Sequence, residues 1–431
     1  MTAAITSSPV GTMASLRSRL DTPLKRAAAY SLVAFALVSL VRVLAGADAM
    51  TSSNTIRFGL AAAAPILLAG LGGLVSERSG TVNIGLDGMI ILGAWFAAWA
   101  GWHFGVWWAI PAGVVGGALG GLLLGFVTLQ FGVNHVVAGI AINLIAPGVT
   151  RFLSGQFFVG HADGSISNSP TMKGSMGSFT MPLLSGGDVF GWKSPDVLGW
   201  LDDHRWFLVS DVAGFARGMT YRIAWTTMFA LVALALVWYL LWRTPLGLRM
   251  RSAGEKPSAT DSLGVSVLSM RYLGCVLSGA LAGGAGAWLA IDVRAYQEGQ
   301  AGGRGFLGLA ALVFGNWQAI GVMAGASLFG YVQALANLAD TDPIRAVFLL
   351  VAVVVGALAI LQWRRRLPIT GAFLAVAATA LLWFFIVTEQ VNAQLVYVMP
   401  YVVTLTVLTV ASQRLRPPAA DGQIWYKDSS G

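Results

Sequence analysis

Residues 76–89 read Ser-Glu-Arg-Ser-Gly-Thr-Val-Asn-Ile-Gly-Leu-Asp-Gly-Met, and this stretch separates two long apolar runs. It brings three ionisable groups, an amide and three glycines into an otherwise apolar region, so a continuous helix is not expected there. Backbone that leaves a helix inside a membrane protein survives only where it lines water or is buried in protein, and paired breaks mark binding sites and gates. The stretch therefore predicts a broken membrane helix, with an ordinary cytoplasmic turn as the alternative.

The composition of the whole chain supports a membrane location. Of its 431 residues, 56% are hydrophobic and 11% are charged, whereas soluble chains carry about 25% charged residues. The mean hydropathy is +0.71, and a soluble enzyme of this length could not hide so much apolar surface from water. The net charge of +8 is interpreted as basic residues on the cytoplasmic side, so no nucleic-acid partner is expected.

Sequence motifs for catalysis are missing. The single cysteine, Cys275, allows no internal disulfide and no cysteine metal cage, and the four histidines lack the H-E-x-x-H spacing of zinc proteases. The sequence also contains no Gly-x-Ser-x-Gly and no Gly-Lys-Ser/Thr string, which hydrolases and nucleotide-binding loops use. We therefore expect this chain to be no enzyme and to hold no metal and no cofactor.

Membrane helices are predicted where about 15 to 25 mostly apolar residues run without charge. These runs are residues 27–46, 58–75, 84–102, 107–129, 136–149, 223–242, 272–291, 306–338, 344–361, 369–387 and 396–411. The run 306–338 is too long for one crossing, and we expect it to break near Gly315-Asn316-Trp317 into two limbs. The prediction is an all-α polytopic membrane protein with about eleven or twelve membrane segments, some of them broken or re-entrant.

The first run, 27–46, has a second interpretation. A basic stretch precedes it and small residues follow it, as in a cleaved signal peptide. Its length and the internal Arg42 favour a retained helix, in which Arg42 near the outer end extends to the membrane interface.

The basic residues set the orientation. With the N-terminus inside, alternation places sixteen Lys and Arg in cytoplasmic segments and four in the short outer loops. The long loop after residue 150 is exempt from this rule because of its length. Both termini are therefore predicted to be cytoplasmic, in a multi-pass protein.

The chain is expected to divide into six parts. They are a cytoplasmic tail (1–26), helices with the broken stretch (27–149), an extracytoplasmic loop (150–222), helices with a cytoplasmic loop at 243–271 (223–342), an extra helical hairpin (343–395), and the last helix with its tail (396–431). The Gly- and Ser-rich loop 150–222 is expected to be a small, largely unordered lobe. Glycines four apart, Gly117 with Gly121 and Gly279 with Gly283, predict close helix contacts.

The cytoplasmic loop contains a predicted short helix. Ser258 could cap it, with Asp261 three residues later, and Gly264 could end it. So short a helix is unstable alone in water and needs a surface to lie on. A solvated basic linker held to anionic lipid is the alternative.

Four motifs in order carry a resemblance. They are Ser-Glu-Arg-Ser-Gly-x-Val-Asn-Ile-Gly-Leu-Asp-Gly-Met, Gly-Leu-Arg-x-Arg-x-x-Gly-Glu-x-Pro-x-Ala-x-Asp-x-Leu-Gly, Leu-Ser-Gly-Ala-Leu-Ala-Gly and Gly-Arg-Gly-Phe-x-x-Leu-Ala-Ala-Leu-Val-Phe-Gly-Asn-Trp. The chain resembles the permease subunit of bacterial ABC importers for nucleosides and simple sugars, ribose-permease-like and served by basic-membrane-protein lipoproteins. The resemblance covers residues 58–338 and resumes at 396–427, and residues 343–395 look like an insertion of two helices.

The resemblance implies the partners. Separate ABC ATPase subunits would bind ATP and Mg and grip the cytoplasmic loop, a lipoprotein would deliver the substrate, and a second permease, identical or homologous, would complete the pore in the bacterial cytoplasmic (inner) membrane. The residues that match the family's loop motif, and are expected to couple to the ATPase, are Gly247, Arg249, Arg251, Gly254, Glu255, Ala259, Asp261 and Gly264.

Candidate residues of the substrate pathway lie in and near the broken stretch. Asn83 and Asp87 share a helical face if the helix begins by Asn83, and either contact a sugar hydroxyl or hold the broken backbone. Asn143 either faces the pore or bonds a neighbouring helix. Glu77 and Arg78 are expected to pair with each other or with neighbouring backbone. The residues expected to shape the break are Glu77, Arg78, Gly80, Gly85 and Gly88.

An ion-coupled secondary transporter of a small polar solute is the alternative function. Such carriers place ionisable residues within their spans, and here only Arg42 and Asp87 clearly do so. Two isolated charges make a poor relay, which favours the importer. The residues leave nucleoside and sugar equally open as substrates.

Overall fold

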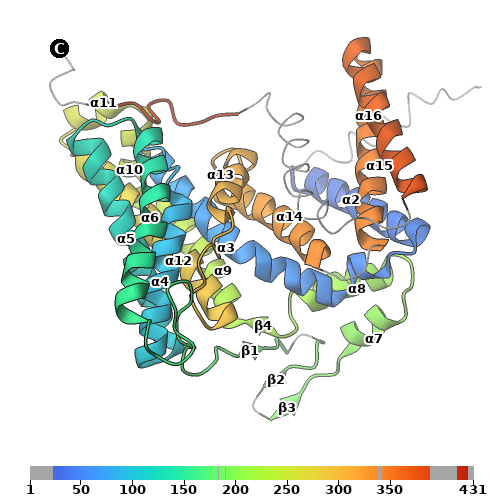
Figure 1. Cartoon of the computed structure of the whole chain (residues 1–431). Helices are drawn as coiled ribbons and strands as arrows, with labels where there is room; N and C mark the ends of the chain where they lie inside the picture. The colour runs from blue at the N-terminus through green and yellow to red at the C-terminus, as the bar shows by residue number, and fades with distance from the viewer. Residues whose placement is uncertain (1–22, 183, 190, 338–341, 389–414, 426–431) are drawn as a thin grey trace, which may run out of the picture. The chain divides into compact units, whose positions relative to one another are not determined.

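The computed structural model describes residues 23–182, 184–189, 191–337, 342–388 and 415–425, and this part is mainly helical (Figure 1). Its helices are α2 (Pro23–Ala45), α3 (Ser53–Arg78), α4 (Leu86–Phe104), α5 (Ala109–Gly125), α6 (His135–Phe157), α7 (Val197–Asp203), α8 (Val209–Gly218), α9 (Trp225–Arg243), α10 (Pro245–Glu255), α11 (Pro257–Ser262), α12 (Val267–Val293), α13 (Arg304–Phe314), α14 (Ala319–Asn337), α15 (Asp342–Arg364) and α16 (Pro368–Val387). The prediction of an all-α fold is confirmed for these residues.

Within the described residues, eight helices are long and apolar enough to cross a membrane. They are Ser53–Arg78, Val106–Gln130, His135–Phe157, Trp225–Arg243, Val267–Val293, Ala319–Asn337, Arg345–Arg364 and Pro368–Val387. Phe35–Ala45 and Arg304–Phe314 are apolar but shorter. The last predicted run, 396–411, lies outside the described residues, and so do residues 1–22 of the N-terminal tail.

The chain divides into two compact units. The smaller unit contains Met1–Ser53, Val197–Arg217 and Leu338–Asn392, and the larger contains Asn54–Asp196, Gly218–Asn337 and Ala393–Gly431. All the candidate pathway and coupling residues belong to the larger unit.

Small residues bring the helices of the larger unit together. There α4, α5 and α12 pack against one another, and α6 lies along α4 (Figure 1). A side chain at Gly117 or Gly121 of α5 would collide with the backbone of α12 at Gly279 or Cys275. The predicted close contact is therefore confirmed, and dispersion forces can act over the full helix crossing.

Both predicted interruptions occur. The first break comprises residues 79–85, between the end of α3 and the start of α4. The second break comprises residues 315–318, between α13 and α14. There Asn316 and Trp317 have φ of 50° and 53°, in a region that residues other than glycine seldom occupy.

The segment between α9 and α12 forms two helices where one was predicted. Thr244 caps α10 by accepting a hydrogen bond from the Gly247 amide (3.1 Å). The prediction that Ser258 caps the next helix is wrong, because α11 starts directly after Lys256 with a proline in its first turn. Gly264, with φ of 78°, follows the end of α11 as predicted.

The segment 150–222 contains more structure than was expected. α6 continues to Phe157, and α7 and α8 follow later in the segment. Its strand β1 (Ser178–Phe179) pairs with β4 (Ile223–Ala224), which directly follows the segment, and β2 (Asp188–Val189) pairs with β3 (Trp192–Lys193). The β1–β4 pairing joins residues far apart in the sequence, which local composition does not indicate.

In the smaller unit, Arg42 of α2 is buried, with 2% of its surface exposed. Its guanidinium pairs with Asp211 of α8 (Nε to Oδ1, 3.1 Å) and with Asp48 (Nη1 to Oδ1, 3.2 Å). The prediction that Arg42 extends to the membrane interface is therefore wrong, because two carboxylates compensate its charge. In the same unit α15 and α16 pack against each other, with the rings of Phe348 and Phe384 4.6 Å apart.

Candidate functional site

Asn143 of α6 bridges the first break. Its Nδ2 donates to the Ile84 carbonyl (2.8 Å), and its Oδ1 accepts from the Gly88 amide (2.7 Å). A side chain at Gly85 or Gly88 would press on the backbone of α6, so these glycines let the break approach Asn143 closely. One neutral amide therefore satisfies an acceptor and a donor that the break leaves without helical partners. Asn143 was expected either to face the pore or to bond a neighbouring helix. These contacts correspond to the second role.

Asn83 lies within the first break and is fully buried. Its Nδ2 donates to Ser278 Oγ of α12 (2.8 Å), and its Oδ1 accepts from the Gly85 amide (2.9 Å). The condition that α4 begins by Asn83 is not met, because the helix begins at Leu86. Asn83 and Asp87 therefore do not share a helical face: Asn83 lies in the break, and Asp87 lies in the first turn of α4.

Asp87 connects α4 to α13. Its Oδ1 accepts a hydrogen bond from the amide of Gly305 in the first turn of α13 (3.0 Å). Gly303 precedes this helix and offers no capping side chain. The carboxylate thus satisfies one of the free amides at the helix N-terminus and compensates the positive end of the helix dipole.

Glu77 and Arg78 join the first break to the second. Glu77 Oε2 accepts from Trp317 Nε1 (2.5 Å), and Arg78 donates to the Trp317 carbonyl from Nη2 (2.7 Å) and Nε (3.1 Å). Arg78 also pairs with Glu255 at the end of α10 (3.6 Å). Arg78 was expected to pair with Glu77 or with neighbouring backbone. Its main-chain partner is instead the carbonyl of Trp317, 239 positions later in the sequence.

The backbone of the first break turns within itself as well. The Ser76 hydroxyl donates to the Thr81 carbonyl (2.5 Å), and the Thr81 amide donates to the Ser76 carbonyl (3.1 Å). Gly80, with φ of 97°, makes this turn possible.

The residues expected to couple to an ATPase fall into two groups. The exposed ones are Arg249, Glu255, Ala259 and Gly264, and the buried or half-buried ones are Gly247, Arg251, Gly254 and Asp261. A side chain at Gly254 would collide with the Arg78 carbonyl. The end of α10 therefore rests directly on the first break.

Two residues of this region were given no role by the sequence alone. Trp317 receives contacts from both charged residues at the end of α3, and Arg271 of α12 is fully buried. A charge at the start of an apolar run could have drawn attention to Arg271, and an aromatic residue directly after a Gly-Asn pair could have indicated Trp317.

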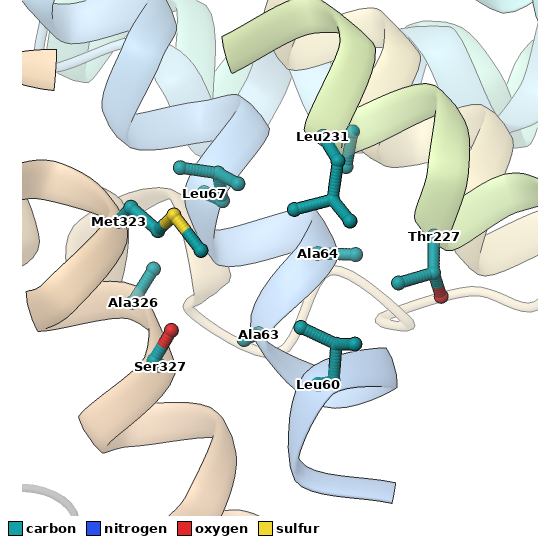
Figure 2. A pocket seen from close by; sticks show the side chains of 10 residues that line it. Leu60, Ala63, Ala64, Leu67, Thr227, Leu231, Met323, Ala326 and Ser327 are labelled. Carbon is teal, nitrogen blue, oxygen red and sulfur yellow. The ribbon is translucent and has the colours of Figure 1, made fainter. Parts of the chain in front are cut away.

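A small cavity lies between α3, α9 and α14 (Figure 2). It is lined by Leu60, Ala63, Ala64, Leu67, Thr227, Ala230, Leu231, Met323, Ala326 and Ser327. Its free volume of about 10 Å³ is close to the minimum for one water molecule. A solute larger than water does not fit there in this conformation.

Comparison with known proteins finds a matching family and several relatives. The family described as branched-chain amino acid transport system / permease component matches residues 55–361, which include both breaks. The guanosine ABC transporter permease protein NupQ of Bacillus subtilis is 33% identical over 65% of this chain and 81% of NupQ. The nucleoside ABC transporter permease protein NupC of Lactococcus lactis is 33% identical over 65% of this chain and 80% of NupC.

A further relative is named for a sugar. This relative, named as a putative glucose ABC transporter permease protein, is TsgC13 of Haloferax volcanii. It is 31% identical over 64% of this chain and 74% of TsgC13. No solved structure matches the chain.

Proposed function

The chain belongs to the branched-chain amino acid transport system / permease component family, and from this premise we propose that it forms the translocation pathway of an ATP-driven importer of nucleosides or simple sugars. It is an ABC transporter permease subunit and is not itself an ATPase. Any energy from ATP must therefore reach it through a separate subunit.

The meeting of the two breaks carries this proposal. Glu77 and Arg78 at the end of α3 both bind Trp317 in the second break, so two interrupted helices are tied together at one point. Paired interruptions of this kind favour a pathway, because backbone that leaves a helix must line water or be buried in protein.

The substrate class rests on the relatives and on the chemistry of the first break. Two relatives are named for guanosine or nucleosides and one for glucose, all of them neutral polar solutes. Transport of a neutral solute needs hydrogen-bonding groups but no counter-charge. Asn83 and Asn143 hold the broken backbone and Asp87 ties the start of α4 to α13, and this frame keeps the path in shape as it opens.

The ATPase binds at α10 and α11 in this proposal. Leu263 at the end of α11 is 84% exposed, and Leu248 on α10 is 57% exposed. Exposed leucines beside the charged Arg249 and Lys256 suit a protein partner better than solvent. A second permease and a substrate-binding lipoprotein complete the importer in the cytoplasmic membrane, with both termini inside and about eleven or twelve membrane segments.

The hairpin at 343–395 is the remaining topological proposal. The family match ends at residue 361, within α15, and α16 lies beyond it. With the tip at Arg364, Arg365 and Arg366 inside, a cysteine at Gln362 is protected from a membrane-impermeant thiol reagent added outside, and a cysteine at Asn392 reacts. The reverse labelling pattern contradicts the topology.

Reconstitution tests the function against the alternative of an ion-coupled carrier. The permease, its ATPase and its binding lipoprotein are placed in proteoliposomes, and uptake of guanosine and of glucose is measured with ATP inside and with ionophores present. We expect uptake that requires ATP and persists when ion gradients are collapsed. Uptake without the ATPase that an ion gradient drives would favour the secondary transporter.

A further inference from the structure

Residues 415–425, named here the C-terminal strap, form no helix or strand, yet they contact four parts of the larger unit. These parts are the end of α10, the first break, the second break and the start of α12. On the strap's side the contacts are made mainly by backbone atoms, so they depend on the path of the chain more than on one side chain.

The strap caps the end of α10. The amide of Ala420 donates to the Gly254 carbonyl (2.9 Å), and the amide of Ala419 donates to Glu255 Oε2 (3.2 Å). The last carbonyls of a helix have no partners within it, so a donor from elsewhere must satisfy them when they are buried. Gly254 is buried, and the strap supplies that donor.

The strap also touches both breaks. The amide of Gly422 donates to the carbonyl of Gly80 in the first break (3.3 Å), and the amide of Arg416 donates to Asn316 Oδ1 in the second (2.8 Å). Gly422 has φ of 71°, and a side chain there would press on Val82. The strap thus holds the two breaks and α10 in one arrangement.

Arg271 anchors the strap to α12. Its Nη1 donates to the Gln423 carbonyl (2.6 Å) and its Nη2 to the Ala420 carbonyl (3.5 Å), and the carboxyl group of Asp421 lies close to it. Arg271 is fully buried, and a buried guanidinium that loses its acceptors is strongly destabilising. The strap therefore completes the environment of this charge.

We propose that the C-terminal strap is a positioning element for energy coupling, which joins the end of α10 to both breaks so that a movement imposed on α10 reaches them together. The proposal rests on the proposed function in one respect, that an ATPase is what moves α10. It requires the junction to stay intact during that movement, so the strap is not a lock that must open.

A distance measurement tests the junction without any transported solute. Spin labels are attached to cysteines at the exposed positions Arg249 on α10 and Gln318 in the second break, in a Cys275→Ala background and in lipid nanodiscs. We expect one narrow distance distribution in the intact protein. A chain ending at Arg414 should give a broad distribution, and a synthetic peptide of residues 415–431 should narrow it again.

Point variants distinguish the effect of losing the Arg271 contact from the effect of shortening the chain. Arg271→Lys removes the planar fork that reaches two carbonyls, so it should broaden the distribution as truncation does. Ile424→Ala is the matched control, because Ile424 is 44% exposed in the same segment. It should leave the distribution unchanged.

The truncated chain and the two point variants, without the label positions, are then assembled with the ATPase. The chain ending at Arg414 should still copurify with the ATPase and hydrolyse ATP, but solute uptake per ATP should fall about tenfold, within the usual range of coupling between sites. Failure of the wild type to transport nucleoside or glucose would contradict the proposed function and leave the distance measurement valid.

Three results would overturn the strap proposal. One is a narrow distribution in both the truncated chain and Arg271→Lys. Another is loss of ATPase binding on truncation while the distribution stays narrow, which would make the strap a docking surface. The third is full uptake per ATP in the truncated chain. If the truncated chain does not insert, Arg271→Lys decides.

Discussion

The first break and the second break are stabilised by different chemistry. In the first, the amide groups of Asn83 and Asn143 bind freed backbone groups at 2.7 to 2.9 Å without introducing charge. In the second, Trp317 is held by the carboxylate of Glu77 and the guanidinium of Arg78. A neutral amide can donate and accept together without the desolvation cost of a charge, so it suits a buried, permanent joint.

The two breaks also differ in the backbone conformation at which they turn. The first break turns at a glycine, Gly80, which adopts positive φ at little cost. The second turns at Asn316 and Trp317, where left-handed backbone costs about 1–3 kcal/mol per residue and persists only with support from its surroundings. We therefore expect the first break to keep its internal shape, as a rigid joint, when α10 moves, and the second to change its backbone conformation when its charged partners move.

The largest expected effect comes from removing the bridge across the first break. Asn143→Leu leaves the Ile84 carbonyl and the Gly88 amide without partners, and each buried unpaired group costs about 1–3 kcal/mol. We expect a loss of about 3 kcal/mol in stability, measured as a lower unfolding temperature in detergent. Leu144→Ala on the same helix is the control, because Leu144 is 75% exposed. An unfolding temperature equal to that of the wild type would contradict the rigid joint.

The next effect concerns the second break. Trp317→Phe keeps an aromatic ring but removes the donor to Glu77, and a hydrogen bond to a charged group contributes about 2 kcal/mol. Uptake should fall more than stability does, because this break is the one expected to change its backbone conformation during transport. A variant that is less stable but transports normally would reverse the assignment of the two breaks.

Asp87 tests whether the contact between α4, directly after the first break, and α13 needs a charge. Asp87→Asn keeps an acceptor for the Gly305 amide and loses about 1 kcal/mol of interaction with the N-terminus of α13. Partial uptake is expected, since a neutral solute needs no counter-charge. Asp87→Leu also loses the hydrogen bond and should insert but transport poorly. Normal transport by both Asp87→Leu and Asn83→Leu would make the first break an ordinary turn.

The smallest effect on transport is expected from pH at the strap. Burial, together with the nearby Glu77 carboxylate, raises the pKa of Asp421 to about 8, although Arg271 acts in the opposite direction. The docked strap then binds more protons than the released strap between the ordinary aspartate pKa of about 4 and pH 8. Docking is therefore strongest at low pH and weakens as pH rises through this window.

Limited proteolysis of the strap measures this dependence. Cleavage within residues 415–425 should become faster from pH 6 to about 9, with the rate of a neutral control peptide used to correct for the protease itself. Asp421→Asn imitates the protonated acid and should weaken the dependence. Cleavage that slows as pH rises would contradict the sign.

Much of the fold could be predicted because membrane helices and their breaks depend on the local amino-acid composition. The apolar runs gave helices at the expected places, and the glycines and charges of 76–89 and the Gly-Asn-Trp of the second break marked the interruptions. A helix boundary was less predictable. Ser258 is a good cap by type, yet the preceding proline set the start of α11 two residues earlier, with Lys256 in the cap position.

The partners of polar side chains could not be predicted. Asn143 had two open roles, and Arg42 was misread because the buried one of its two compensating carboxylates, Asp211, lies far away in the sequence. Glu77 and Arg78 looked like a local pair until Trp317 was brought beside them.

By itself the sequence indicated an all-α membrane protein with two interrupted apolar runs, because hydrocarbon restricts backbone to helices and tolerates few exceptions. Its four ordered motifs carried the resemblance to permeases. Tertiary structure alone decided which groups satisfy the broken backbone and that residues 415–425 join α10 to both breaks. The reason is that a freed carbonyl or a buried charge accepts any suitable partner. Only the packing of the helices selects one among the many that the sequence offers.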